Sequence, residues 1–241
     1  MKKSVITTAA IILLLQSCGK NAESGSVSVF ESGNSDKSAL LNVQMDQFVP
    51  VDSSGVLMFP MQMGQRTDES GNSYYKETPE SSYWNIVFLN TQTGEHHLLT
   101  EEKIILDSYY LSENEQVGEE DRKKSYRHIF YVGRNVDFNR DKMITGKDPV
   151  ALFVSDREGR NFRKISPQNA SLRNWQYFPE SSRVVMVASA DSDKNSQFDL
   201  NDEISSYEVI LNQNETPKPL FDQAFRQKLK TLYDRDWKKI K

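Results

Sequence analysis

The chain has 241 residues, of which 37% are hydrophobic and 27% charged, and its formal net charge at pH 7 is −4. This length allows one sizeable hydrophobic core, and the acidic balance argues against nucleic-acid binding, which calls for a basic face. A low apolar content with many Tyr, Phe, Ser, Asn and Thr residues is typical of an all-β surface protein.

The first residues predict a secretory leader. Lys2 and Lys3 form a positive segment, and the uncharged, mostly apolar residues 5–15 are too few to cross a membrane as a helix. Leu15-Gln-Ser-Cys18 follows, and Cys18 is the single cysteine of the chain. An ordinary signal peptide with an incidental cysteine is the alternative to a lipidation site at this position.

This leader resembles a bacterial lipobox, in which the cysteine becomes the acylated first residue of the mature protein. The resemblance implies a signal peptide at residues 1–17, acyl chains such as palmitate on Cys18, and a lipoprotein anchored in the bacterial cell envelope. The expected location is the outer membrane, on its periplasmic or surface face. Residues 18–40 then form a polar spacer of the kind that lets a domain stand off a membrane.

Residues 41–221 contain an internal repeat of about 55 residues. Each unit begins with an aromatic-rich strand and a polar turn, continues with two apolar strands, and closes on a short strand. The first unit comprises residues 47–59, 84–89 and 96–99, the second 109–111, 127–132, 149–154 and 161–165, and the third 175–187, 206–211 and 217–221. Four short strands per unit are typical of propeller blades.

The turn Pro179–Ser182 and the stop Leu98–Thr100 resemble motifs of TolB-like β-propellers. The resemblance implies an all-β fold with three full four-stranded blades. Residues 27–33 and 37–41 can add a partial N-terminal blade. Because three and a half blades are fewer than in the smallest usual closed ring, an open β-sandwich or a partial ring is the alternative.

Two segments carry the oxygen-ligand ladder D-x-[DN]-x-[DN] of an EF-hand-like calcium loop. Loop 1 supplies Asp137, Asn139, Asp141, Met143, Thr145 and Asp148, and loop 2 supplies Asp191, Asp193, Asn195, Gln197, Asp199 and Asp202. These residues stand at loop positions 1, 3, 5, 7, 9 and 12, where position 7 offers its backbone carbonyl. Both loops lie at equivalent points of the repeat, between the second and third strands, so they are not part of a helix-loop-helix module.

The two loops depart from the EF-hand pattern at position 6, where Lys142 and Ser196 replace Gly, and at position 12, where Asp replaces Glu. Loop 2 offers four carboxylates and loop 1 three, so we expect tighter binding at loop 2, with dissociation constants on the order of 0.1–1 mM. The expected role of Ca²⁺ is structural. The alternative is that Asp- and Asn-rich turns form without a metal. Residues 61–82 of the first unit carry no such ladder.

Residues 222–241 predict a short basic amphipathic helix. Its apolar side chains recur at helical spacing: Phe225, Leu229, Leu232, Tyr233, Trp237 and Ile240. We expect this face to pack on the protein's own domain, with an anionic lipid surface or a partner protein as the alternative.

The sequence contains no catalytic motif that specifies an enzyme. His96 and His97 are neighbours on an expected strand and therefore point to opposite faces, and His128 is expected at the surface or a strand edge. We therefore expect a non-enzymatic binding or assembly scaffold, anchored in the membrane, whose partner is an envelope protein or a glycan and not a nucleic acid. A carbohydrate- or peptide-acting hydrolase, with carboxylates that converge between blades, is the alternative.

Overall fold

The computed structural model describes residues 44–51, 55–62, 82–111, 127–199, 201–213 and 216–238. All of them belong to the compact unit formed by residues 41–241. The predicted signal peptide, Cys18, the polar spacer and the partial blade lie outside the described residues. Over the described parts the chain is mostly β, with one α-helix near the C-terminal end, and neither of its two sheets closes on itself.

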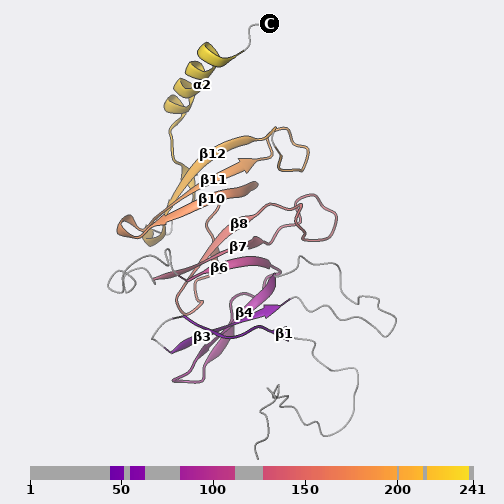
Figure 1. Ribbon diagram of the computed structural model, residues 1–241, viewed down its shortest axis with the longest axis vertical. Helices are drawn as coiled ribbons and strands as arrows, with labels where there is room; N and C mark the ends of the chain where they lie inside the picture. The colour runs from indigo at the N-terminus through magenta and orange to yellow at the C-terminus, as the bar shows by residue number, and fades with distance from the viewer. Residues whose placement is uncertain are drawn as a thin grey trace, which may run out of the picture. The chain divides into compact units, whose positions relative to one another are not determined.

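The strands form three antiparallel units, here called meanders, in which neighbours along the chain pair with each other (Figure 1). Meander 1 comprises β2 (Val49–Pro50), β3 (Val56–Gln62), β4 (Tyr83–Asn90) and β5 (His96–Leu98), and β1 (Gln44–Met45) pairs with the far end of β3. Meander 2 comprises β6 (Ile105–Tyr110), β7 (His128–Arg134), β8 (Ala151–Asp156) and β9 (Arg163–Lys164). Meander 3 comprises β10 (Ala170–Phe178), β11 (Arg183–Ala190), β12 (Glu203–Ile210) and β13 (Lys218–Pro219).

The expected four strands per unit are therefore present, in the expected order. Meanders 1 and 2 join in one sheet through the pair Tyr83 and Leu106, whereas meander 3 is a separate sheet. Two short 3₁₀ helices, Pro179–Ser181 and Leu211–Gln213, follow β10 and β12.

The first strands of meanders 2 and 3 begin earlier than the sequence pattern predicts. Both contain a register shift, between Leu106 and Ser108 in β6 and between Leu172 and Asn174 in β10. A bulge places an extra residue in one strand and so reverses which side chains face inward. The alternation used to recognise a strand is interrupted there, and only the part after each bulge was predicted.

Meander 2 is buried on both faces. Alternate residues of β7 enter two different cores, because successive side chains of a strand point to opposite faces. Ile129 and Tyr131 pack with meander 1, together with Phe88 and Met58, while Phe130 packs with Tyr177 of meander 3. The backbone N–H of Leu172 donates to the carbonyl of Val150 (2.8 Å), which adds a direct link between meanders 2 and 3.

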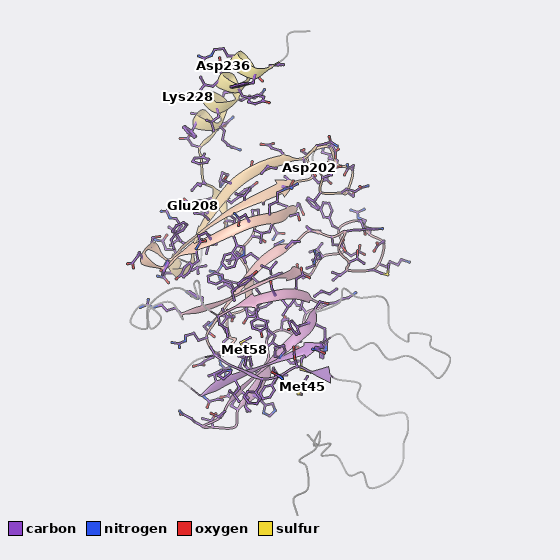
Figure 2. The ribbon with its side chains drawn as sticks, viewed as in Figure 1. Met45, Met58, Asp202, Glu208, Lys228 and Asp236 are labelled. Carbon is purple, nitrogen blue, oxygen red and sulfur yellow. The ribbon has the colours of Figure 1, made fainter. Side chains whose placement is uncertain are left out.

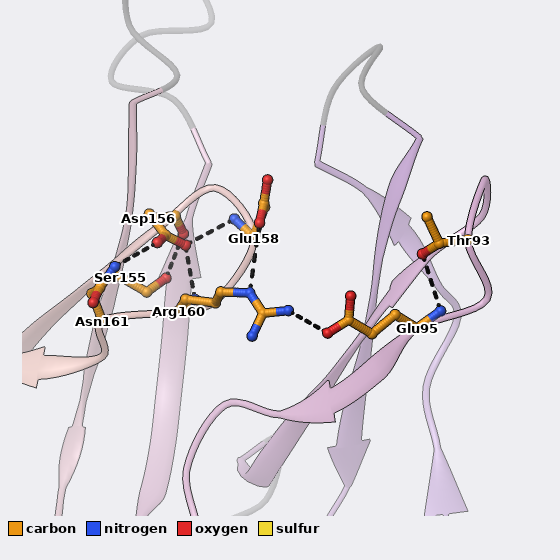
Figure 3. A network of polar contacts seen from close by, with 7 residues as sticks. All are labelled: Thr93, Glu95, Ser155, Asp156, Glu158, Arg160 and Asn161. Carbon is orange, nitrogen blue, oxygen red and sulfur yellow. Dashed lines mark hydrogen bonds and ion pairs between the residues drawn. The ribbon is translucent and has the colours of Figure 1, made fainter.

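The turns that follow β4 and β8 are built alike. The side chain of Asn90 accepts the N–H groups of Gln92 and Thr93, and that of Asp156 accepts those of Glu158 and Arg160. Figure 3 shows how the second turn reaches the first: Arg160 Nη2 lies 2.7 Å from Glu95 Oε1. Both side chains are exposed, and such a pair adds at most about 1 kcal/mol to stability.

The helix α2 (Gln223–Trp237) does not pack as expected. None of its residues is buried, whereas the amphipathic pattern predicted that its apolar face would lie on the protein's own domain. The pattern specifies a helix with two faces, but it does not specify which surface covers the apolar one.

Candidate metal centre

Loop 1 joins β7 to β8 and is held together by its predicted ligand residues. The carboxylate of Asp137 accepts the backbone N–H groups of Asp141 (3.1 Å) and Lys142 (2.8 Å). The side chain of Asn139 also accepts from Asp141 (3.0 Å), and that of Asp141 accepts from Met143 (2.9 Å). The side chains at positions 1, 3 and 5 are therefore turned toward the inside of the loop.

Loop 2 joins β11 to β12 and repeats these contacts at the same positions. The carboxylate of Asp191 accepts the N–H groups of Asn195 (3.0 Å) and Ser196 (3.1 Å). The side chain of Asp193 accepts from Asn195 (3.1 Å), and that of Asn195 accepts from Gln197 (2.7 Å). Two loops with different intervening residues thus adopt one conformation, which is set by the ladder residues that they share.

Position 12 closes each loop with a buried carboxylate. Asp148 accepts the N–H groups of Phe138 and Thr145, both at 2.8 Å. Asp202, labelled in Figure 2, accepts those of Ser192 (2.8 Å) and Asp199 (2.9 Å). Both side chains are almost fully buried, at 3% and 7% exposure. A buried carboxylate needs compensating donors or a cation, and each of these two has two backbone donors.

The loops keep the sharp EF-hand-like turn although they lack its glycine. Positions 4 and 6 have positive φ in both loops, at Arg140 (61°) and Lys142 (70°) and at Lys194 (62°) and Ser196 (62°). Residues with a Cβ adopt this region with some strain. The replacement of Gly by Lys142 and Ser196 at position 6 therefore adds backbone strain to the turn but does not change its backbone conformation.

Loop 2 gathers enough charge at one point to hold a cation. Oxygen atoms of Asp191, Asp193 and Asp202 all lie within 4.8 Å of one another, and this is the one cluster of three such groups among the described residues. Ca²⁺ binds oxygen at about 2.3–2.6 Å, so ligands on opposite sides of one ion are about 5 Å apart. Backbone N–H donors hold the pKa of Asp202 below its usual range, chiefly the donor of Ser192, which keeps this carboxylate charged.

The remaining predicted ligands of loop 2 lie outside the cluster of three carboxylates. Asp199, at position 9, accepts the N–H of Asn201 (2.7 Å), and Thr145, at the same position of loop 1, accepts that of Lys147 (3.3 Å). Met143 and Gln197 are exposed and would contribute backbone carbonyls only. The donor set fits a hard cation such as Ca²⁺ at loop 2, and loop 1 offers the same scaffold with an amide in place of the second carboxylate.

Two arginines that the sequence pattern did not indicate hold the loop backbones. Arg134, at the end of β7, donates through Nε to the carbonyl of Asp148 (3.2 Å) and forms an ion pair with Asp107 of β6. Arg173 of β10 donates through Nη2 to the carbonyl of Asp199 (3.1 Å). Both contacts join residues far apart in the chain, so no local spacing could have predicted them.

The two loops also touch each other. The rings of Phe138, at position 2 of loop 1, and Phe198, at position 8 of loop 2, have centroids 5.0 Å apart. The apolar residues at position 8 of the two loops differ in their surroundings: Ile144 is buried, but Phe198 is only half-buried and packs against the other loop. A polar cleft of about 580 Å³ lies between the loops, lined by Asn139, Lys147, Asp148, Asn195, Gln197 and Asp199, among others.

The histidines do not assemble a site. His97 stacks on Phe88 (5.6 Å between centroids), while its neighbour His96 is exposed. His128 is half-buried between the rings of Phe130 and Tyr177, so the expectation of a surface or edge position was wrong. Burial lowers the pKa of His128, because desolvation disfavours the charged imidazolium.

The comparisons with known proteins assign no family. No family model matches the chain, and no curated protein matches it. Similar solved structures include the tricorn protease, with 12% identity and a TM-score of 0.34 over 70% of this chain and 18% of that chain. They also include a putative TolB from Agrobacterium tumefaciens, with 13% identity and a TM-score of 0.30 over 70% of this chain and 62% of that chain.

The chain thus spans less than two thirds of the length of either structure. TM-scores this low carry no argument about fold or function. Among the residues with described positions, no helix has the length and apolar character needed to cross a membrane.

Proposed function

We propose that the protein is a non-enzymatic scaffold of the bacterial cell envelope, built from propeller-like blades and stabilised by Ca²⁺ in loops 1 and 2. Cys18 carries the lipid anchor, and the exposed part of the domain binds an envelope protein or a glycan. Three meanders of four strands support the blade-like arrangement, and the lipobox supports the anchor.

The observation that carries the calcium assignment is the shared conformation of the two loops. Backbone N–H groups bind the same ladder positions in both, and three carboxylates of loop 2 converge within 4.8 Å. Clustered carboxylates repel one another, and a bound cation reverses the sign of that interaction. Because each loop connects two central strands of a meander, a bound ion would clamp those strands together.

The test is a calcium titration of the chain from Gly19 onward, which contains every described residue. We expect chelation to lower the melting temperature. Ca²⁺ at about ten times its dissociation constant should raise it by roughly 3–6 °C for each occupied site. Calorimetric titration should give dissociation constants on the order of 0.1–1 mM, with loop 2 the tighter.

Matched variants separate the two sites from a general charge effect. Asp191→Asn with Asp193→Asn should abolish the tighter site, and Asp137→Asn with Asp141→Asn the weaker one. Glu101→Gln with Glu102→Gln removes two exposed carboxylates elsewhere and should leave both sites unchanged. No thermal shift at millimolar Ca²⁺, or an equal loss in the control, would contradict the proposal.

The anchor is tested separately in a bacterial host. The full chain should incorporate labelled palmitate, and Cys18→Ser should abolish the label without changing the calcium titration. A label that persists in this variant would contradict lipidation at Cys18.

A further inference from the structure

We propose that α2 is a second membrane-contact element, which lies flat on an anionic lipid surface with its apolar face in the headgroup region. This inference does not depend on calcium binding or on the lipid anchor. It follows from the construction of the helix, from the exposure of its apolar face and from the distribution of charge around that face.

The start of α2 is fixed by the sequence itself. The carboxylate of Asp222 accepts the backbone N–H of Phe225 (2.7 Å), which is an N-terminal cap. The ring of Phe221 packs on that of Phe225, with 5.2 Å between centroids, just before the first turn. The helix therefore begins at a defined residue without help from another element.

The apolar face of α2 is continuous and exposed. Its members are spaced three or four residues apart, so they lie on one side of the helix. Their exposed fractions are 43% for Phe225, 47% for Leu229, 39% for Leu232, 64% for Tyr233 and 75% for Trp237. An isolated helix of about 15 residues is marginally stable in water, because most helical stability in proteins comes from packing of the apolar face. This face therefore needs a surface to cover it.

The charge around the face identifies that surface as anionic. Residues 222–241 have a net charge of +4, although the whole chain has −4. At about 100° per residue, Lys230 lies at one edge of the apolar face, and Lys228 and Arg235 lie at the other. Arg226 lies between the directions of Tyr233 and Trp237. Long cationic side chains at such edges can reach lipid phosphates while their stems cover apolar surface. Tyr and Trp are favoured where an apolar layer meets water.

Asp236 is the one acidic residue within the apolar arc. Its carboxylate forms two contacts of 2.7 Å with Arg235, which neutralises its charge. Figure 2 labels Asp236 and, on the same helix, Lys228. A second copy of α2 is a poorer occupant than lipid, because two such helices face to face would bring their basic edges together.

The experiment measures co-sedimentation of the chain from Gly19 onward with vesicles, so that no acyl anchor contributes. We expect binding to vesicles that contain phosphatidylglycerol and weak binding to pure phosphatidylcholine. Added salt should weaken the binding, and far-ultraviolet circular dichroism should show a gain in helix.

Two substitutions that introduce the same residue test the face. Leu229→Asp lies on the apolar side, and Gln227→Asp lies about 160° away around the helix. We expect Leu229→Asp to weaken vesicle binding by on the order of tenfold or more, and Gln227→Asp to change it little. Both variants should retain the melting temperature of the β domain, since no residue of α2 is buried.

Three outcomes would overturn the proposal. Equal binding to anionic and zwitterionic vesicles would show that charge does not contribute. Equal loss of vesicle binding in Leu229→Asp and Gln227→Asp would show that the apolar face does not contribute. Absence of vesicle binding together with a dimer in sedimentation velocity would assign the face to a second copy. Because calcium binding is measured on the same variants, failure here is distinguishable from failure of the calcium proposal.

Discussion

Gly94 and Gly159 lie in matching turns, after β4 and after β8, and have nearly the same backbone conformation. Their φ angles are +75° and +78°, a region that residues with a Cβ adopt with strain. They differ in their surroundings. A Cβ on Gly94 would meet nothing within 4 Å, but one on Gly159 would lie 2.3 Å from the ring of Phe88 in meander 1. Gly159 is therefore a contact residue between meanders 1 and 2.

Because only Gly159 lacks room for a Cβ, alanine substitutions at the two glycines separate the cost of backbone strain from the cost of a steric clash with Phe88. Gly94→Ala should cost about 1 kcal/mol in the free energy of unfolding, from the positive φ alone. Gly159→Ala should cost about 2–4 kcal/mol, because Phe88 must also move within a packed core. Chemical denaturation of the two variants measures the gap, and equal losses would show that Gly159 has room for a methyl group.

Loops 1 and 2 are elements whose conformation depends on contacts with the rest of the fold. Each is held by its own ladder, by an arginine (Arg134 of β7 for loop 1, Arg173 of β10 for loop 2), and by the ring pair Phe138 and Phe198. Phe138 also donates its N–H to Asp148, and Phe198 precedes Asp199, whose N–H binds Asp202. Phe138 thus contacts the buried position-12 carboxylate of loop 1 through its backbone, and Phe198 is the chain neighbour of the residue that contacts that of loop 2.

We therefore expect Phe138→Ala, a substitution in loop 1, to change the conformation of loop 2. Loss of the ring pair should lower the free energy of unfolding by about 1–2 kcal/mol. It should also weaken Ca²⁺ binding at loop 2 several-fold, measured by calorimetry with loop 1 inactivated by Asp137→Asn and Asp141→Asn.

Phe48→Ala is the matched control for this variant. Its ring lies 5.9 Å from that of Phe59 in meander 1. It should leave calcium affinity unchanged. Unchanged affinity at loop 2 in Phe138→Ala would show that the loops act independently.

At the scale of the whole β domain, meander 2 contributes to both hydrophobic cores. Phe88 belongs to the core that it shares with meander 1, and Phe130 to the core that it shares with meander 3. Neither core can be lost without exposing one face of β7 and β8. Residues 44–221 are therefore expected to unfold as a cooperative unit.

Phe88→Ala and Phe130→Ala test this expectation from the two sides. Each should lower the free energy of unfolding by about 3–5 kcal/mol and leave a single calorimetric transition. Phe178→Ala, at a position that is 47% exposed, should change it by less than about 1 kcal/mol. Two separated transitions in either core variant would show that the meanders unfold independently.

The sequence predicted the local features of this protein well. Alternation and turn residues located four strands in each unit, and the oxygen ladders located both loops between the second and third strands. These signals are local because strand faces and tight turns depend on neighbouring residues. Calcium itself stays a prediction, as does the lipid on Cys18.

The features that only the tertiary structure revealed involve contacts between residues distant in the chain. The bulges in β6 and β10 concealed the first part of each strand, and no spacing indicated Arg134, Arg173 or the contact of Phe138 with Phe198. The sequence by itself determined that residues 222–241 favour a two-faced basic helix, but only the structure decided that this face is left uncovered. Propensity and periodicity act over a few residues, whereas burial is decided by which distant surfaces meet.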